Sequence, residues 1–351
     1  MKHFNYIFLL LPCCLHAQSL RINPGVQVTM SGAPYLVLNN TSLVNNGRFI
    51  TDNSTVLFAG ATHTYIDGSS PISFYNLTVH IPSGELQLHT NTIVTGTMAM
   101  DSGNLQLNTY TLSLGSSGRI MGERNDARIT GNSGGTITIT TPLDAPHAVN
   151  PGNIGVEITS NANLGPTLIT RGHVQPDNAQ GQTGIQRYFE IAPSLHRDAL
   201  AALRFYYFDS ELGDKNKNEL DLFAVPPGQN NWTLQGKDYS DGINNWVLKS
   251  NVNPSQRFTL APARNNTVSG ASVQIYPNPA REAFTLLLFS ATEKQGIISL
   301  SDQSGHVLES RMIHCLPGIN KTTWNIAGYA AGAYHLVFNR LDVKNTTILK
   351  Q

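Results

Sequence analysis

The chain has 351 residues, in which 23 Lys and Arg balance 23 Asp and Glu, and only 13% of the residues are charged. Such a neutral, weakly charged chain lacks the basic surface that nucleic acid or an anionic membrane would need, so we expect no nucleic-acid partner. The length allows two or three domains. Frequent Thr, Ser, Asn and Gly between regularly spaced apolar residues favour an all-β fold.

The first 17 residues are interpreted as a signal peptide that is removed during export. A basic residue precedes a mostly apolar run over residues 4–15, and Ala17 is a small residue at the expected cleavage point. The apolar run is too short to span a bilayer with ease. A lipoprotein signal at Cys13 or Cys14 is the alternative, although the residues before them are not the small ones that such a signal requires.

Cleavage after Ala17 would leave Cys315 as the single cysteine. Stability must then come from an apolar core, because no disulfide can form within the chain. Cys315 lies between Ile313 and Leu316, which favours a small buried hydrophobic residue over a reactive thiol.

An internal repeat marks residues 18–141. Residues 86–92, Leu-Gln-Leu-His-Thr-Asn-Thr, resemble residues 105–111, Leu-Gln-Leu-Asn-Thr-Tyr-Thr, 19 positions later, and residues 36–42 are a looser copy. Alternating leucines with small residues at corners, recurring about every twenty residues, predict a β-solenoid of stacked turns. An irregular β-sandwich is the alternative. A glycine follows each copy of the repeat: Gly47 follows residues 36–42, Gly96 follows residues 86–92 and Gly115 follows residues 105–111.

A polysaccharide-cleaving solenoid would carry acids and a base on one sheet, and the nearby candidates are Glu85, Asp101, His80 and His89. Glu85 and Asp101 lie close to glycines, which favours solvated turns over a catalytic pair. The common metalloprotease, P-loop, nucleophile-elbow and Cys-x-x-Cys motifs do not occur in the sequence. We therefore expect no catalytic residues and no enzyme activity.

Residues 142–184 turn to Pro, Gly and Asn and are interpreted as a β connector. Residues 185–262 alternate aromatic and aliphatic residues over several short strands, which predicts a β-sandwich domain. Residues 263–272 are polar, which is typical of a linker.

The densest acidic stretch of the predicted sandwich resembles part of a calcium-binding loop. Asp214, Asn216 and Asn218 match the first three ligand positions of an EF-hand loop, but Glu219 and Val225 replace the required glycine and the bidentate glutamate. We therefore expect a solvated hairpin loop, no metal ligands and no cofactor, with a looser cation site as the alternative.

Three aromatic residues of the same region, Trp232, Tyr239 and Trp246, allow two interpretations. One is an aromatic platform for sugar rings. The other is core packing, which the alternation with Leu234 and Leu248 favours because sandwiches fill their interiors in this way.

The last predicted domain is residues 273–351. Its first strand, residues 273–276, ends at two prolines, because proline removes a donor from the strand ladder. Short apolar runs follow at about ten-residue spacing, and seven such strands predict a second small sandwich. The predicted fold class is therefore all-β, with an N-terminal β-solenoid-like repeat region followed by two Ig-like β-sandwich domains.

The last domain resembles a known family, the C-terminal sorting domain, type A, of type IX secretion substrates in Bacteroidetes-type bacteria. The matching pieces are Tyr-Pro-Asn-Pro with a following Phe-x-Leu, an Asp-x-Ser-Gly turn, spaced glycines and a terminal strand with lysine. The order of so many pieces makes the resemblance specific, whereas Pro-Asn-Pro alone would only indicate a loop. We assign the sorting-signal motif to Tyr276, Pro277, Asn278, Pro279, Asp302, Gly305, Gly318, Gly328, Gly332 and Lys350.

The resemblance implies export across the outer membrane by the type IX translocon and removal of the domain by its sortase. In many relatives it also implies attachment to surface lipopolysaccharide. We therefore expect a secreted or cell-surface protein with a structural or adhesive role and a glycan or another cell-surface molecule as ligand. A carbohydrate-binding accessory or a polysaccharide-active enzyme is the alternative.

Overall fold

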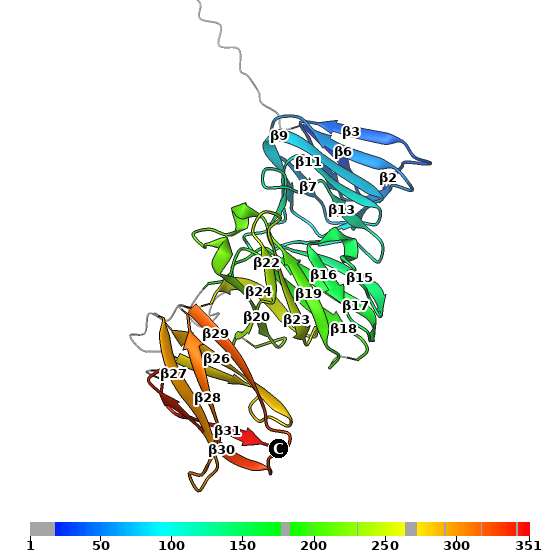
Figure 1. The fold of residues 1–351 in the computed structure, drawn as a ribbon. Coiled ribbons are helices and arrows are strands. Elements are labelled where there is room, and N and C mark those ends of the chain that lie inside the picture. The colour runs from blue at the N-terminus through cyan, green and yellow to red at the C-terminus, as the bar shows by residue number, and fades with distance from the viewer. Residues whose placement is uncertain are drawn as a thin grey trace, which may run out of the picture. The chain divides into compact units, whose positions relative to one another are not determined.

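The structure is a computed structural model that describes residues 18–176, 183–196, 198–229, 231–263, 272–290, 293–316, 318–341 and 343–351. The described residues form strands and three short 3-10 turns, which confirms the all-β class (Figure 1). The chain divides into two compact units, Met1–Ala263 and Arg264–Gln351. The expected signal peptide and residues 264–271 of the expected linker lie outside the described residues.

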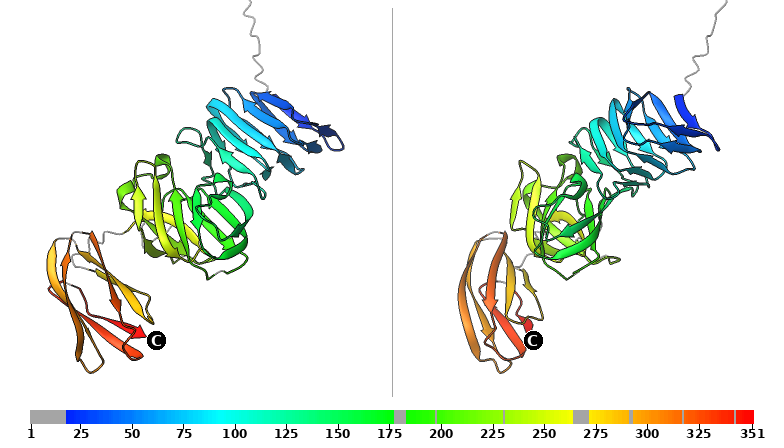
Figure 2. Two further views of the ribbon diagram at one scale, coloured as in Figure 1. Left: turned by 45° about the vertical axis from the view of Figure 1, so that its right-hand side comes forward. Right: turned by 90° about the vertical axis from the view of Figure 1, so that its right-hand side faces the viewer.

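The N-terminal part of the first unit is a β-solenoid-like stack, as the repeat predicts (Figures 1 and 2). Each turn of the chain lies parallel to the turn before it, so one hydrogen-bonded ladder runs along each side of the coil. The strands are β1 (Gln18–Ile22), β2 (Gln27–Thr29), β3 (Tyr35–Asn39), β4 (Thr41–Asn45), β5 (Arg48–Ile50), β6 (Thr55–Ala59), β7 (Thr64–Asp67), β8 (Ile72–Phe74), β9 (Asn76–Leu88), β10 (Thr92–Val94), β11 (Thr97–Gln106), β12 (Thr111–Ser113), β13 (Arg119–Met121), β14 (Ile129–Thr130) and β15 (Thr136–Asp144).

The repeat in the sequence is the pairing register of these strands. Leu86 of β9 pairs with Leu105 of β11, and Gln87 pairs with Gln106. Both leucines are fully buried, whereas both glutamines are only partly buried on the outer face. Because each inward position stacks on its equivalent one turn later, the coil needs only apolar residues there.

Two of the predicted corner glycines lie so close to the backbone of a neighbouring segment that a side chain would not fit. A Cβ atom at Gly96 would lie 2.8 Å from the carbonyl oxygen of Tyr75 in the preceding turn, and one at Gly47 would overlap the carbonyl oxygen of Val26. Gly115 has room around it but takes a φ of +61°, in the left-handed region that favours glycine.

Strand β15 carries the solenoid into the next sheet. It pairs in parallel with β12 and antiparallel with β17, so the same sheet continues with the opposite strand sense. The sheet is extended by β17 (Asn163–Gly172), β18 (Tyr188–Pro193), β24 (Arg257–Pro262), β20 (Leu220–Val225) and β21 (Thr233–Gly236).

A second antiparallel sheet packs on this extension. Phe189 of the first sheet meets Phe205 of the second edge to face, with ring centroids 4.8 Å apart. A single apolar cluster runs from Ile22 in the solenoid to Leu260 in β24. Residues 142–184, which we expected to form a connector, supply β16 and β17 to the two sheets. The second sheet consists of β16 (Val156–Thr159), β19 (Ala201–Tyr206), β23 (Trp246–Val252) and β22 (Tyr239–Asp241), and the 3-10 turns are η1 (Pro151–Asn153), η2 (Asp209–Glu211) and η3 (Lys217–Glu219).

The second unit has two antiparallel sheets with their own core, built around Trp324 stacked on Phe284. Cys315 is fully buried in this core, and burial raises the pKa of its thiol, which confirms the prediction of a buried hydrophobic role. The Ig-like class predicted for both sandwich regions stays a prediction. One sheet contains β25 (Ser272–Tyr276), β26 (Ala283–Ser290) and β29 (Gly318–Asn325), and the other β28 (Val307–Cys315), β27 (Lys294–Ser301), β30 (Gly332–Asn339) and β31 (Thr346–Lys350).

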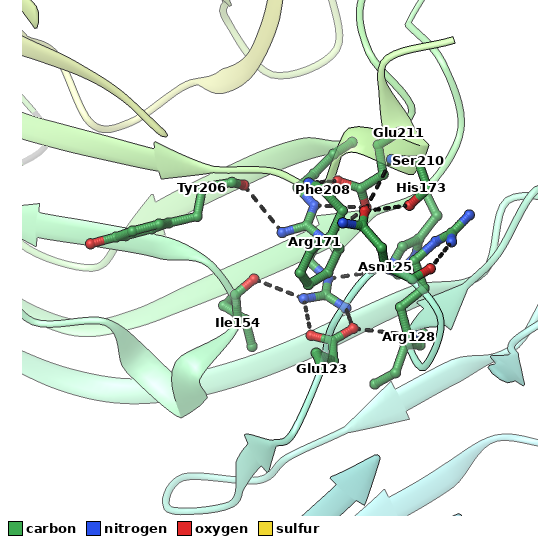
Figure 3. Close-up of polar contacts among 12 residues, drawn as sticks. Glu123, Asn125, Arg128, Ile154, Arg171, His173, Tyr206, Phe208, Ser210 and Glu211 are labelled. Atoms are coloured by element: carbon green, nitrogen blue, oxygen red, sulfur yellow. Dashed lines mark hydrogen bonds and ion pairs between the residues drawn. The ribbon is translucent and has the colours of Figure 1, made fainter. Parts of the chain in front are cut away.

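A buried ion pair ties the last solenoid turn to β17 (Figure 3). Arg171 donates hydrogen bonds of 2.7 and 2.8 Å to the two carboxylate oxygens of Glu123, and one of 3.0 Å to the carbonyl of Ile154. Its Nε–H donates to Nε2 of His173 at 3.2 Å. Burial and the charge of Arg171 lower the pKa of His173 well below its usual value, so this imidazole is neutral and can accept that bond.

The protonation of Glu123 depends on this pairing. Burial by itself raises the pKa of Glu123, but the charge and hydrogen bonds of Arg171 outweigh burial and lower the pKa to about 2. A second buried pair, between Arg187 and Glu211 at 2.7 Å, lies in the same part of the unit. Removing one partner of such a pair leaves the other charge buried and uncompensated.

We predict that Glu123→Gln lowers the free energy of unfolding of the first unit by about 3 kcal/mol at pH 7. Because the pKa of Glu123 falls on folding, its contribution is complete above its ordinary pKa of 4.5 and disappears as the pH falls towards 2. Urea unfolding followed at pH 7 and at pH 3 measures both effects.

The matched control is Glu190→Gln, since Glu190 pairs with Arg257 at 2.7 Å but with a side chain that is 30% exposed. We expect this change to cost less than about 1 kcal/mol. Equal losses in the two variants would contradict the role given to the buried pair.

Candidate functional site

The Tyr-Pro-Asn-Pro segment lies against the last strand of the chain. The Asn278 side chain donates from Nδ2 to the carbonyl of Thr347 at 3.1 Å, and its Oδ1 accepts from the N–H of Leu349 at 2.9 Å. Two backbone bonds continue this contact, from the N–H of Ala280 to Leu349 and from the N–H of Gln351 to Ala280. An asparagine amide carries the same donor and acceptor as a peptide group. Residues 278–280 therefore cover the outer edge of β31.

Two exposed prolines flank Asn278. Proline has no N–H and a fixed φ, so Pro277 and Pro279 can supply neither a strand ladder nor many alternative backbone conformations. The side chain of Asn278 takes over the pairing that the backbone of this segment would otherwise provide. The motif thus positions one amide on the edge of β31.

Asp302 holds the turn between β27 and β28. Its Oδ1 accepts hydrogen bonds from the hydroxyl and the N–H of Ser304, at 2.6 and 2.9 Å, and from the N–H of His306 at 3.0 Å. These bonds, the one from the Ser304 hydroxyl above all, lower the pKa of Asp302. Gly305 completes the turn with a φ of +83°.

The remaining motif residues bring these two segments to one end of the unit. Gly332 opens β30 and pairs with Lys350 of β31, and Gly332 and Asp302 line the same hollow of about 350 Å³. The ammonium of Lys350 donates to the carbonyl of Arg281, just beyond the prolines, at 2.6 Å. Gly328 follows β29 at this end.

We call this end the motif face and define it as Tyr276–Pro279, Asp302, Gly305, Gly328, Gly332 and Lys350. Gly318 is not part of it, because Gly318 begins β29 and pairs with Ser290 at the opposite end of β26. The side chain of Asn320 acts there instead, bonding to the N–H and the carbonyl of Leu316.

The sequence motif identifies the residues of the motif face, but it does not predict that these residues contact one another. Asn278 and Leu349 are 71 positions apart, and no periodicity connects them. The one available signal was an asparagine between two prolines, where only a side chain can make the missing strand contact.

In the solenoid, two of the candidate catalytic residues meet. Nδ1 of His80 lies 2.7 Å from Oδ2 of Asp101, and the hydroxyl of Ser102 lies 3.2 Å from the same Nδ1. A nucleophile and an orienting acid must bind opposite nitrogens of the ring, so this arrangement cannot relay a proton as a triad does. All three side chains are at the solvent-facing surface.

The other two candidates are linked through the side chain of Gln87, whose Oε1 lies 3.3 Å from Nε2 of His89. Glu85 accepts a hydrogen bond of 2.7 Å from Gln87, and His89 stacks on Tyr65 with centroids 5.2 Å apart. The structure records no contact that joins Glu85 to Asp101 among the described residues, and the absence of enzyme activity stays a prediction.

The acidic stretch does not assemble the calcium ligands of an EF-hand. The Asn216 side chain accepts from the N–H of Asn218 at 3.1 Å and so caps η3, while Asp214 bonds to Lys215. Within the described ranges, no three His, Cys, Asp or Glu side chains gather as a metal site would require.

The three aromatic residues separate into two groups. Trp232 is buried against Phe223 and Ala261, as core packing predicts. That prediction is wrong for Tyr239, which is 62% exposed and lies beside half-buried Trp246 with ring centroids 5.5 Å apart. Trp246 is on the outer face of β23, because its neighbour Val247 takes the inward position. Apolar residues occupy both faces of this strand, so the sequence pattern does not show which face is buried.

The sequence motifs do not predict the buried ion pairs Glu123–Arg171 and Arg187–Glu211. They border a hollow of about 370 Å³ that is also lined by Asn150, Asn153 and Tyr206. The available signal was alternation, since Arg171 follows buried Ile169 by two positions on the same face of β17. Both guanidinium groups already bind carboxylates, so this hollow presents no uncompensated charge.

Comparison with known proteins identifies one region. Residues 274–350 match the family of secretion system C-terminal sorting domains. No curated protein and no solved structure matches the chain. No helix in the described part of the chain has the length and apolarity that a membrane crossing requires. The matched region begins in β25, ends in β31 and contains all ten motif residues. Residues 274–350 are therefore a type IX secretion C-terminal sorting domain, and the chain is a secreted or cell-surface protein.

Proposed function

We propose that this chain is a structural or adhesive protein of the bacterial cell surface, delivered there by the type IX translocon. The observation that carries the proposal is the sorting domain, which forms a compact unit separate from residues 18–263. We call residues 18–263 the passenger. A detachable address joined to a passenger is the arrangement that export followed by processing requires.

The outer surface of the passenger supports the structural or adhesive role. Val37, Leu57, Thr78, Ala99 and Met121 stand in register on successive turns of one face. Equivalent side chains therefore repeat at the strand spacing of about 4.8 Å. Solenoids use such repeating surfaces to bind extended partners.

The motif face suits recognition by the translocon and its sortase. It joins residues from both ends of the domain, so it exists only when the last strand is in place. After processing, surface lipopolysaccharide of a Bacteroidetes-type bacterium is the proposed attachment point. The proposed ligand of the passenger is a glycan or another cell-surface molecule. No catalytic role is proposed.

We predict that Asn278→Ala reduces the amount of passenger on the cell surface. The change removes both side-chain bonds to the edge of β31, each of which contributes about 0.5–1.5 kcal/mol. Fractionation of a producing strain with antibody to the passenger measures the surface and periplasmic pools. Asn325→Ala is the control, because the Asn325 side chain accepts a hydrogen bond from the N–H of Ala327 at the same end of the domain and makes no recorded side-chain bond to β31 among the described residues. Equal surface amounts for Asn278→Ala and the unchanged protein would argue against the motif face.

Removal of residues 345–351 should trap the protein in the periplasm with the passenger still folded. β30 would keep β27 but lose β31 on its other edge, and that unpaired strand edge would replace the recognised surface. The surface form of the intact protein should end before Val273 and run about 9 kDa smaller than the form that keeps the sorting domain, at roughly 110 Da per residue. Surface protein that still carries Ile348–Gln351 would contradict this prediction.

A further inference from the structure

The second sheet of the passenger has one side turned away from the core. Val156, Leu203, Phe205 and Val247 point inward and are almost fully buried. The alternate positions of the same strands therefore face outward. In register across the sheet they are Glu157, Arg204, Leu248 and Tyr239, with Tyr206, Trp246 and Asp241 in the adjacent row.

The aromatic residues of this outer face form an ordered stack. The guanidinium carbon of Arg204 lies 4.6 Å from the centroid of the Trp246 ring. The Tyr239 ring lies 5.5 Å from the Trp246 ring at an angle of 34°. Trp246 is half-buried and supports Tyr239, which is 62% exposed. A large aromatic ring held in one orientation with its surface in water is a binding feature rather than a packing one.

Polar groups beside the stack hold it in place. Arg204 donates to Glu157 at 3.0 Å and to the hydroxyl of Tyr206 at 3.3 Å, and that hydroxyl donates to Glu157 at 3.2 Å. The carboxylate of Glu157 keeps lone pairs for further donors, because four sites are available on its two oxygens. The charges of Arg204 and Glu157 compensate each other.

The hairpin that carries both rings is also fixed. Asp241 ends β22, and its Oδ1 accepts from the N–H groups of Ile243 and Asn244 at 2.8 and 3.0 Å. Its Oδ2 accepts from the side chain of Asn244 at 2.7 Å. Binding to a fixed hairpin costs little ordering of the loop, so weak contacts can yield measurable affinity.

We propose that this outer face binds a neutral pyranose residue of a glycan, an inference that rests on the adhesive role proposed above. The apolar C–H face of one sugar would lie on Tyr239, and hydroxyl groups of a neighbouring sugar in the same glycan would bond to Glu157 and Tyr206, because Glu157 lies three strands away from Tyr239 across the sheet. A neutral sugar fits because the charges at the rim are paired, whereas an anionic ligand would need an unpaired cation. Trp232 takes no part, since it is buried in the core.

The purified full chain should be titrated with neutral hexasaccharides of β-1,4-glucan, xylan and mannan, with polygalacturonate as the anionic comparison. Calorimetry gives the Kd, and tryptophan fluorescence reports contact near Trp246. We expect at least one neutral hexasaccharide to bind and Tyr239→Ala to weaken it about tenfold. Tyr239→Phe should stay within about twofold, because the ring is retained.

Tyr35→Ala is the matched control, because Tyr35 is 73% exposed on the solenoid, away from the stack. It should leave the Kd unchanged. No binding of any neutral hexasaccharide at millimolar concentration, binding only of polygalacturonate, or equal Kd values for Tyr239→Ala and the unchanged chain would each overturn the proposal. The titration uses purified protein in solution, so its failure would leave the export results intact, and a failure of export would leave the titration intact.

Discussion

Strand β15 is bonded along both of its edges, and the architecture of the passenger depends on that pairing. The last turn of a solenoid would expose a free strand edge, and a free edge invites pairing with other chains. Here β15 receives β12 in parallel on one edge and β17 antiparallel on the other. The coil therefore ends by becoming an antiparallel sheet. The Glu123–Arg171 pair lies at this transition and joins the loop of the last turn to β17 by charge and hydrogen bonds.

The same constraint shapes the sorting domain. The last strand, β31, has β30 on one edge, and the Asn278 segment closes the other. Closing an edge with a side-chain amide between two prolines makes the surface depend on residues from both ends of the domain. A recognition surface of this kind reports that the domain has folded completely. That property suits an export signal, because it separates finished molecules from unfinished ones.

The sequence predicts the contacts that repeat along the solenoid. It does not predict the contacts between residues that belong to no repeat. Leu86 and Leu105 were aligned by sequence similarity, and the structure pairs the same two residues, because parallel stacking places equivalent residues side by side. The motif residues were recognised by their order, but not the contact between Asn278 and β31. Buried Arg171 was missed, since its partner Glu123 lies 48 positions away on another turn. Tyr239 was assigned to the wrong side because Trp246, Val247 and Leu248 are all apolar, which hides the inward face.

If residues 264–351 are a self-contained export address, they should direct an unrelated protein to the cell surface. The most direct measurement is to fuse these residues to a reporter that carries only a signal peptide, and to measure the reporter on the surface of intact cells by antibody labelling. We expect the reporter on the surface with the unchanged domain, and in the periplasm when residues 345–351 are removed. A reporter that stays in the periplasm with the complete domain, in a strain that exports the natural protein, would contradict it.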